Sequence, residues 1–173
     1  MKKHSFAFIS FVFILAILFC GCASYKLGST LDPALADVFV PTVRNTVNQT
    51  DIEAIVTSAL ISEIQREGTM RIRAKEKATT ILEVEIIDYK QDTLRYHRDD
   101  LERAAEYSMT IKAKVTFKKL NDANGETVIS SGVYSAYDTF LSGIDTIASK
   151  RGGLSQVSKK LAEQIVEGCV NAW

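Results

Sequence analysis

Cys22 is the residue whose type and position most clearly indicate chemistry, because its thiol directly follows an apolar N-terminal segment. Met1-Lys2-Lys3 forms a short basic start, and Phe6 to Phe19 forms an uncharged, mostly apolar run of 14 residues. A membrane-spanning helix needs about 20 such residues, so we interpret this run as the apolar part of a secretory signal. A thiol at its end is placed for acylation, and each buried methylene of an acyl chain contributes ~0.8 kcal/mol to membrane binding.

The segment ending in Gly21-Cys22 resembles the lipobox of bacterial lipoprotein precursors. The resemblance implies that residues 1–21 are removed as a signal peptide and that Cys22, acylated with chains such as palmitate, becomes the first residue. Cys20 fits less well, because the bulky Phe19 would then precede the cut. Residues 23 and 24 are Ala and Ser rather than Asp, which by the same resemblance favours the outer membrane over the inner. A plain signal peptide or an N-terminal anchor helix is the alternative.

Two cationic segments could bind an anionic group. Residues 88–104 and 138–153 have the composition of charged connections, the first between two strands and the second before the last helix. Guanidinium groups bind phosphate through two hydrogen bonds, and an ammonium group acts as a point charge. The candidate binding residues in these segments are Arg95, Arg98, Arg103, Lys150 and Arg151. A solvated charged loop without a ligand is the alternative for each of them.

Catalytic and metal-binding patterns are missing from the sequence. Of the two histidines, His4 lies in the signal segment, and His97 has no second His and no Cys nearby to complete a zinc site. No nucleophile elbow, phosphate-binding loop or dinucleotide fingerprint occurs. Asp99-Asp100 is best interpreted as a pair of solvated carboxylates. We therefore predict no enzymatic activity, no cofactor and no metal site.

Charge and cysteine content argue against a nucleic-acid-binding protein and against a disulfide-stabilised domain. The chain has 21 basic and 21 acidic residues, and removal of Lys2 and Lys3 with the signal leaves a mature part of net charge −2. Such a balance gives no reason to expect a nucleic-acid partner. Cys169 is then the only cysteine besides the acylated one, so no internal disulfide is expected. Its position on an apolar helical stripe predicts a small buried core residue.

One helix is predicted near the start of the mature chain. After a lipidated tether over residues 22–37, Asp37 to Pro41 has the pattern of a short strand. Thr50-Asp51-Ile52-Glu53 matches a capping box, and Gly68 is a natural helix stop, so the predicted helix covers residues 51–67. Its buried stripe is expected to contain Ile52, Ile55, Val56, Ala59, Leu60 and Ile64.

The middle of the chain alternates with a period of two, which is typical of strands that bury one face. Predicted strands cover residues 70–73, 82–86, 107–118 and 126–137, with a turn at 121–125 and a bulge at Gly132. In the clearest of them, apolar side chains occupy every second position from Tyr107 to Phe117. Glu83 and Glu85 are expected opposite Lys112 and Lys114 on the wet face.

A closing helix is predicted from apolar residues at three- and four-residue spacing. The stripe consists of Leu154, Val157, Leu161, Ala162, Ile165, Cys169 and Ala172. Two helices must bury two stripes on the one apolar face of the sheet. We therefore predict one α+β domain over residues 38–173, a two-layer sandwich in which two helices pack on one face of a mostly antiparallel sheet of four to five strands.

Four stretches together resemble the LptE family of lipopolysaccharide-assembly lipoproteins. They are Cys22-Ala23-Ser24-Tyr25-Lys26-Leu27-Gly28, Val38-Phe39-Val40-Pro41 leading to Arg44-Asn45-Thr46, Ala105-Glu106-Tyr107 at the start of a long strand, and the closing helix. Ala23-Ser24 departs from the glycine that the family has after its cysteine. The resemblance extends over nearly the whole mature chain and implies two helices against a four-stranded sheet.

The resemblance also implies a function without covalent chemistry. LptE proteins plug and support the outer-membrane β-barrel LptD and help to deliver lipopolysaccharide to the outer leaflet. It therefore predicts an outer-membrane lipoprotein that faces the periplasm, with a barrel and lipopolysaccharide as partners and with the two cationic segments as candidate contacts. The alternative is a lipid-anchored adaptor of another envelope transport or cell-wall synthesis complex.

Overall fold

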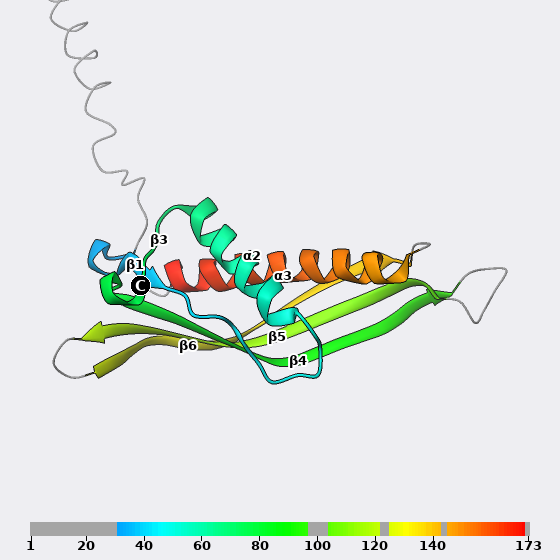
Figure 1. The fold of residues 1–173 in the computed structure, drawn as a ribbon, viewed down its shortest axis with the longest axis horizontal. Helices are drawn as coiled ribbons and strands as arrows, with labels where there is room; N and C mark the ends of the chain where they lie inside the picture. The colour runs from blue at the N-terminus through cyan, green and yellow to red at the C-terminus, as the bar shows by residue number, and fades with distance from the viewer. Residues whose placement is uncertain (1–30, 97–103, 122–124, 143–144, 172–173) are drawn as a thin grey trace, which may run out of the picture.

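Three long strands and two helices make up most of the protein (Figure 1). The computed structural model describes residues 31–96, 104–121, 125–142 and 145–171. Its long strands are β4 (Thr80–Tyr96), β5 (Ala104–Asn121) and β6 (Gly125–Leu141), which pair antiparallel in sequence order. The helices α2 (Ile52–Glu67) and α3 (Thr146–Asn171) lie side by side on one face of this sheet. The predicted α+β class with both helices on one face is confirmed.

The sheet itself is mixed and has six strands, which corrects the expected mostly antiparallel sheet of four to five. The short strands β1 (Asp37–Phe39), β2 (Arg44–Asn45) and β3 (Arg71–Ile72) all pair parallel to their neighbours. The strand order is β3-β1-β4-β5-β6, and β2 pairs separately with β4. Parallel pairing of β1 with β3 follows from the chain between them, because α2 serves as a crossover. A 3-10 turn precedes β1 (η1, Pro33–Leu35), and another follows β3 (η2, Lys75–Lys77).

The charged segment 88–104 is mostly strand, which corrects its prediction as a connection. β4 continues to Tyr96, and β5 already begins at Ala104. The alternation in the sequence breaks at Ile86-Ile87, where the register shifts between Ile86 and Asp88. A bulge of this kind adds one residue to the strand. Even-numbered residues face the helices up to Ile86, and odd-numbered residues do so from Tyr89 on. The two adjacent apolar residues therefore mark a bulge inside a strand.

The core lies between the helices and the inner face of the sheet. As predicted, every second residue of β5 from Met109 to Phe117 is buried, with at most 2% of its surface exposed. The six members of the predicted α3 stripe that lie in the described chain are also buried. Cys169 is one of them, with a free thiol whose pKa is raised to about 12 by burial. Neither helix of the described chain combines the length and apolar character of a membrane span.

Ion pairs on the outer face follow the register, with one correction. Glu85 lies opposite Lys114 as expected. Glu83 lies opposite Thr116 and forms an ion pair with Lys118 at 2.7 Å, while Lys112 pairs with Asp88 at 3.5 Å. The register of β4 with β5 therefore places Glu83 beyond both expected lysines, and the bulge after Ile86 brings Asp88 into the position opposite Lys112.

The start of α2 differs from the predicted capping box. Asp51 is the N-cap residue with a left-handed backbone (φ 63°), and no side chain caps the helix. Glu53 accepts a hydrogen bond from Asn45 Nδ2 at 2.9 Å instead of folding back on the helix start. A tertiary contact has therefore replaced the local one. The predicted stop is confirmed, because Gly68 has φ 82° and donates from its amide to the Ile64 carbonyl at 3.1 Å.

The start of α3 and the path of β6 correct the second predicted connection. β6 continues to Leu141 and α3 begins at Thr146, so much of 138–153 is regular structure. Asp145 Oδ1 accepts hydrogen bonds from the amides of Ile147 and Ala148, both at 3.0 Å, and so caps the helix. Gly132 pairs regularly with Val115, and the bulge expected there lies at the shift between Phe117 and Lys118. Gly125 has the positive φ of 79° expected for the turn.

Candidate functional site

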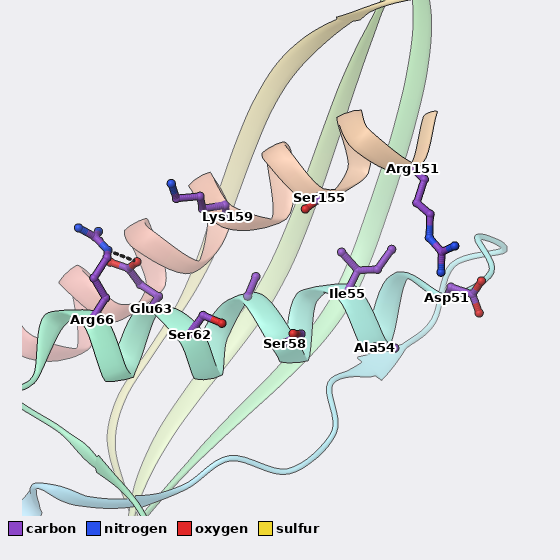
Figure 2. Close-up of a pocket in the computed structure, with 11 residues that line it drawn as sticks. Asp51, Ala54, Ile55, Ser58, Ser62, Glu63, Arg66, Arg151, Ser155 and Lys159 are labelled. Carbon is purple, nitrogen blue, oxygen red and sulfur yellow. Dashed lines mark hydrogen bonds and ion pairs between the residues drawn. The ribbon is translucent and has the colours of Figure 1, made fainter. Parts of the chain in front are cut away.

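A groove separates the outer sides of α2 and α3 (Figure 2). Its volume is about 660 Å³, and both helices contribute its walls. The lining residues are Asp51, Ala54, Ile55, Ser58, Ala59, Ser62, Glu63, Arg66, Arg151, Ser155 and Lys159. The groove is long and open, with a small-residue floor and charged groups along its rim.

Small side chains create the groove. Ala54, Ser58 and Ser62 follow one another at four-residue spacing and therefore share one side of α2. Ser155 faces them from α3. Ile55 and Ala59, which we predicted as core residues, are only half-buried because they line this groove. The other four members of the predicted α2 stripe are buried.

Cations without an internal partner lie at one end and in the middle of the groove. Figure 2 shows Arg151 above Asp51 at the start of α2, and Lys159 two turns further along α3. No hydrogen bond or ion pair within the described residues occupies Arg151 or Lys159. Both side chains are exposed, so their donors remain available to a ligand.

The other end of the groove is closed by a satisfied ion pair. Arg66 donates from Nε and Nη2 to both carboxylate oxygens of Glu63, at 2.8 and 2.6 Å. Glu63 is only 6% exposed, and its hydrogen bonds and charge raise the pKa of Arg66. A buried carboxylate without such a partner would be costly. This end of the groove therefore has a structural ion pair, and the available cations lie at the opposite end and in the middle.

A second hollow of about 200 Å³ extends the cationic end. It shares Asp51, Ile55 and Arg151 with the groove and adds Lys150 and the 82% exposed Ile147. We call Lys150, Arg151, Lys159, Ile55 and Ile147 together the groove mouth. The groove mouth combines three cations with two exposed or half-buried aliphatic side chains, which suits an amphiphile with an anionic head.

Lys150 is held in place by an aromatic ring. Its Nζ lies 5.9 Å from the centroid of the Tyr89 ring, a distance typical of a cation–π contact. The Tyr89 hydroxyl donates to Gln91 Oε1 at 3.1 Å, and burial raises the Tyr89 pKa. Tyr89 lies on the helix-covered face of β4. The Lys150 side chain therefore extends from α3 toward this face of the sheet.

The structure brings together only part of the predicted cationic set. Lys150 and Arg151 meet at the groove mouth, although both lie within α3 rather than before it. Arg95 is on the opposite face of the sheet, where it forms an ion pair with Glu106. The neighbouring Tyr107 points to the helix side and stacks on Phe140. Arg98, Arg103 and Cys22 lie outside the described residues.

Six polar residues of the groove were not predicted from the sequence. They are Ser58, Ser62, Glu63, Arg66, Ser155 and Lys159, although the small residues at four-residue spacing from Ala54 to Ser62 were a recognisable pattern. Within the described residues, no three His, Cys, Asp or Glu side chains gather in a way that could hold a metal ion. The arrangement offers anion contacts and an open trough for an elongated ligand.

Comparison with known proteins identifies a family by sequence and a fold by structure. The family model described as LptE, lipopolysaccharide-assembly, matches residues 35–167. A search of curated proteins finds no match. Protein XCC0632 from Xanthomonas campestris has a similar structure, with a TM-score of 0.60 at 9% identity over 85% of this chain and 89% of that one.

The hypothetical protein CT253 from Chlamydia trachomatis is also similar. Its TM-score is 0.56 at 14% identity, over 80% of this chain and 99% of that one. At these identities the structural likeness shows a shared fold and says nothing about a shared ligand.

Proposed function

Because the chain belongs to the LptE family of lipopolysaccharide-assembly proteins, we propose that it is an outer-membrane lipoprotein of lipopolysaccharide transport. In this proposal residues 1–21 direct export, and acylated Cys22 anchors the chain to the outer membrane on its periplasmic side. The domain plugs and supports an LptD-like β-barrel, through which lipopolysaccharide reaches the outer leaflet.

The mixed charge of the outer sheet face supports a plug role. On this face the acids lie mostly on β4 and the lysines on the neighbouring β5, and several of them are paired with each other. The lumen of a large membrane barrel is polar, so a protein inside it needs a polar exterior of both signs. The outer face of β4 and β5 meets that requirement, and the apolar side of the sheet is covered by the helices.

The groove mouth is the observation that supports contact with lipopolysaccharide itself. This lipid combines phosphate groups with acyl chains, and the groove mouth combines Lys150, Arg151 and Lys159 with two aliphatic side chains. Arginine binds phosphate through two parallel hydrogen bonds, and lysine adds a point charge. The groove mouth lies at the opposite end of the molecule from β1 and the last turns of α3 (Figure 1). The headgroup would therefore bind far from the point where the described chain starts.

Charge reversal at the groove mouth tests this contact. The triple variant Lys150→Glu, Arg151→Glu, Lys159→Glu should bind purified lipopolysaccharide about 100-fold more weakly, because three attractive charges become repulsive (~3 kcal/mol). The matched control is Lys75→Glu, Lys77→Glu, Lys119→Glu, which changes three exposed lysines away from the groove by the same total charge. It should keep its affinity. Equal losses in both variants would show a general charge effect and remove the groove mouth from the binding site.

A further inference from the structure

β6 is a long edge strand without the features that normally protect an edge. It has 17 residues and ends the strand order of the sheet. Within the described residues, only β5 pairs with it, and this pairing has no register shift from Ser130 to Leu141. The main-chain groups that point away from β5 therefore form an open ladder along this part of the strand. Such a ladder is a template for another extended segment.

The opposite side of the sheet is protected, which makes the open edge specific to β6. β3 has two residues, and its flanking Arg71 and Arg73 both bind Asp37, at 3.0 and 3.1 Å. Beyond β2, the free part of β4 carries several charges and three register shifts. Short length, charge and bulges are the usual protections against edge pairing.

The outer face of the sheet changes from charged to uncharged toward this edge. β4 and β5 carry paired acids and lysines there. The outward residues of β6 are all exposed, and they are Ser131, Val133, Ser135, Tyr137, Thr139 and Leu141. Val133, Tyr137 and Leu141, which we call the apolar edge, are 62%, 54% and 68% exposed. A segment beside β6 would therefore gain apolar cross-strand contacts as well as main-chain hydrogen bonds.

α3 limits what can pair with β6, because the helix packs directly on this strand. A Cβ on Gly153 would lie 2.5 Å from Phe140 Cδ1, and a Cβ on Gly168 would collide with the Tyr134 hydroxyl. Two such helix-covered edges could not pair, since paired strands lie about 5 Å apart and packed helices need about 8–10 Å. The edge therefore excludes β6 of a second copy and admits a single extended segment that carries no helix.

α3 also indicates the chemistry of that segment. Three exposed polar residues at four-residue spacing share one side of the helix, and they are Gln156, Lys160 and Gln164. Lys160 Nζ binds Asp138 Oδ1 of β6 at 2.9 Å, which places this side of α3 over the strand. A segment paired with β6 thus meets polar side chains on its helix side and the apolar edge on its outer side. Alternating polar and apolar residues satisfy both faces of an extended segment.

We propose that β6 pairs with an alternating, extended segment of the barrel that the domain plugs. This inference rests on the proposed function. The outer face of β4 and β5 suits the polar lumen of a barrel, and β6 continues that face to the edge of the sheet, so the segment beside β6 comes from the barrel. The strands of a closed wall pair with each other and leave no free edge. The segment is therefore a loop or chain end that projects into the lumen.

Photo-cross-linking of the full lipidated chain in its native membranes tests this pairing. p-Benzoylphenylalanine, placed singly at Ser131, Val133, Ser135 and Tyr137, should cross-link each variant to the barrel, and mass spectrometry locates the linked sites. Because side chains on one face of a strand recur every two residues, the linked site should move by about two residues per step along one continuous segment. The control probe at Thr116, on the outer face of β5, should not link to that segment.

Lysines at the apolar edge test the contribution of the pairing to the complex. Val133→Lys with Tyr137→Lys should reduce the amount of copurified barrel about tenfold, because charge protects an edge and the apolar contacts are lost. The control Thr110→Lys with Thr116→Lys adds the same charge to the lysine-bearing outer face of β5 and should keep its barrel. Both variants should unfold in urea close to the wild type, since all four side chains lie on the outer face.

The outcomes separate this inference from the proposed function. A barrel that copurifies but gives no cross-link from β6, or gives linked sites without order along its sequence, would overturn the edge pairing and leave the plug role intact. Equal loss of the barrel in both lysine variants, or cross-links to a second copy of this chain, would also overturn it. A preparation without any barrel would remove the proposed function, and the edge pairing with it.

Discussion

Cys22→Ser is expected to abolish lipid attachment completely and to leave the precursor unprocessed. A serine hydroxyl is a much weaker nucleophile than a cysteine thiolate, and the lipobox resemblance ties both the acylation and the cut to a cysteine at position 22. Each acyl chain contributes ~0.8 kcal/mol per buried methylene to membrane binding, so the variant would lack the lipid anchor. Labelling with radioactive palmitate, together with the mass of the chain in membranes, measures both effects.

Cys20→Ser provides the matched control for this prediction. Cys20 lies two residues earlier in the same apolar context, and in our interpretation it leaves with the signal peptide. This variant should therefore be labelled and processed like the wild type. Palmitate incorporation that persists in Cys22→Ser and disappears in Cys20→Ser would place the lipid on Cys20 and contradict the prediction.

Gly153→Ala is expected to destabilise the domain by about 1–3 kcal/mol, although alanine normally favours a helix. α3 approaches β6 closely at this point, and a Cβ on Gly153 would lie 2.5 Å from Phe140 Cδ1 and 2.8 Å from its Cγ. These atoms belong to the base of the ring, so the ring must rotate as a whole. Rotation would also disturb its stacking on Tyr107, whose ring centroid is 5.4 Å away. Urea unfolding measures the change in stability.

Gly152→Ala should have the opposite sign. Gly152 is the preceding residue of the same helix, it is exposed, and no atom lies within 4 Å of the position of its Cβ. The substitution therefore gains helix propensity, about 0.5–1 kcal/mol, without a clash. If both alanine variants were equally stable, the close packing of α3 on β6 at Gly153 would be wrong.

The elements of the fold were predictable where a local pattern decides the structure. The alternation from Tyr107 to Phe117 and the stripe of α3 gave the correct faces, because one side of each element packs in the core. Gly68 ended α2 as expected, because a left-handed residue there costs least as glycine. In these cases the sequence neighbours and the tertiary structure favour the same conformation.

Distant contacts account for the errors. Glu53 was expected to cap α2 and instead binds Asn45, a partner that only the tertiary structure supplies. The bulge at Ile87 hides the continuation of β4, because it breaks the alternation that a pattern search follows. Strands were predicted at the positions of β1 and β3, but β2 was missed, because its two residues are too few for any periodicity. The parallel pairing of all three depends on distant contacts that a local pattern does not contain. The groove needs two helices side by side, and neither helix indicates it alone.

The candidate site was predictable only in its chemistry. Lys150 and Arg151 stood out as phosphate-binding residue types, and the structure places them at one groove mouth. Arg95 had the same composition signal, yet the register shift between Thr93 and Arg95 places it on the other face of the sheet. Residue type therefore indicated what could be bound, and the register of β4 decided which residues could act together.

Purification of the tagged full-length chain from its native membranes in mild detergent tests the central claim most directly. A β-barrel of the outer membrane, large enough to enclose the domain, should copurify in equal amount and remain bound in moderate salt. Mass spectrometry identifies it, and lipopolysaccharide should be present in the same fraction. Recovery of a periplasmic enzyme or an inner-membrane transporter without any barrel would contradict the account and favour an adaptor of a different envelope complex.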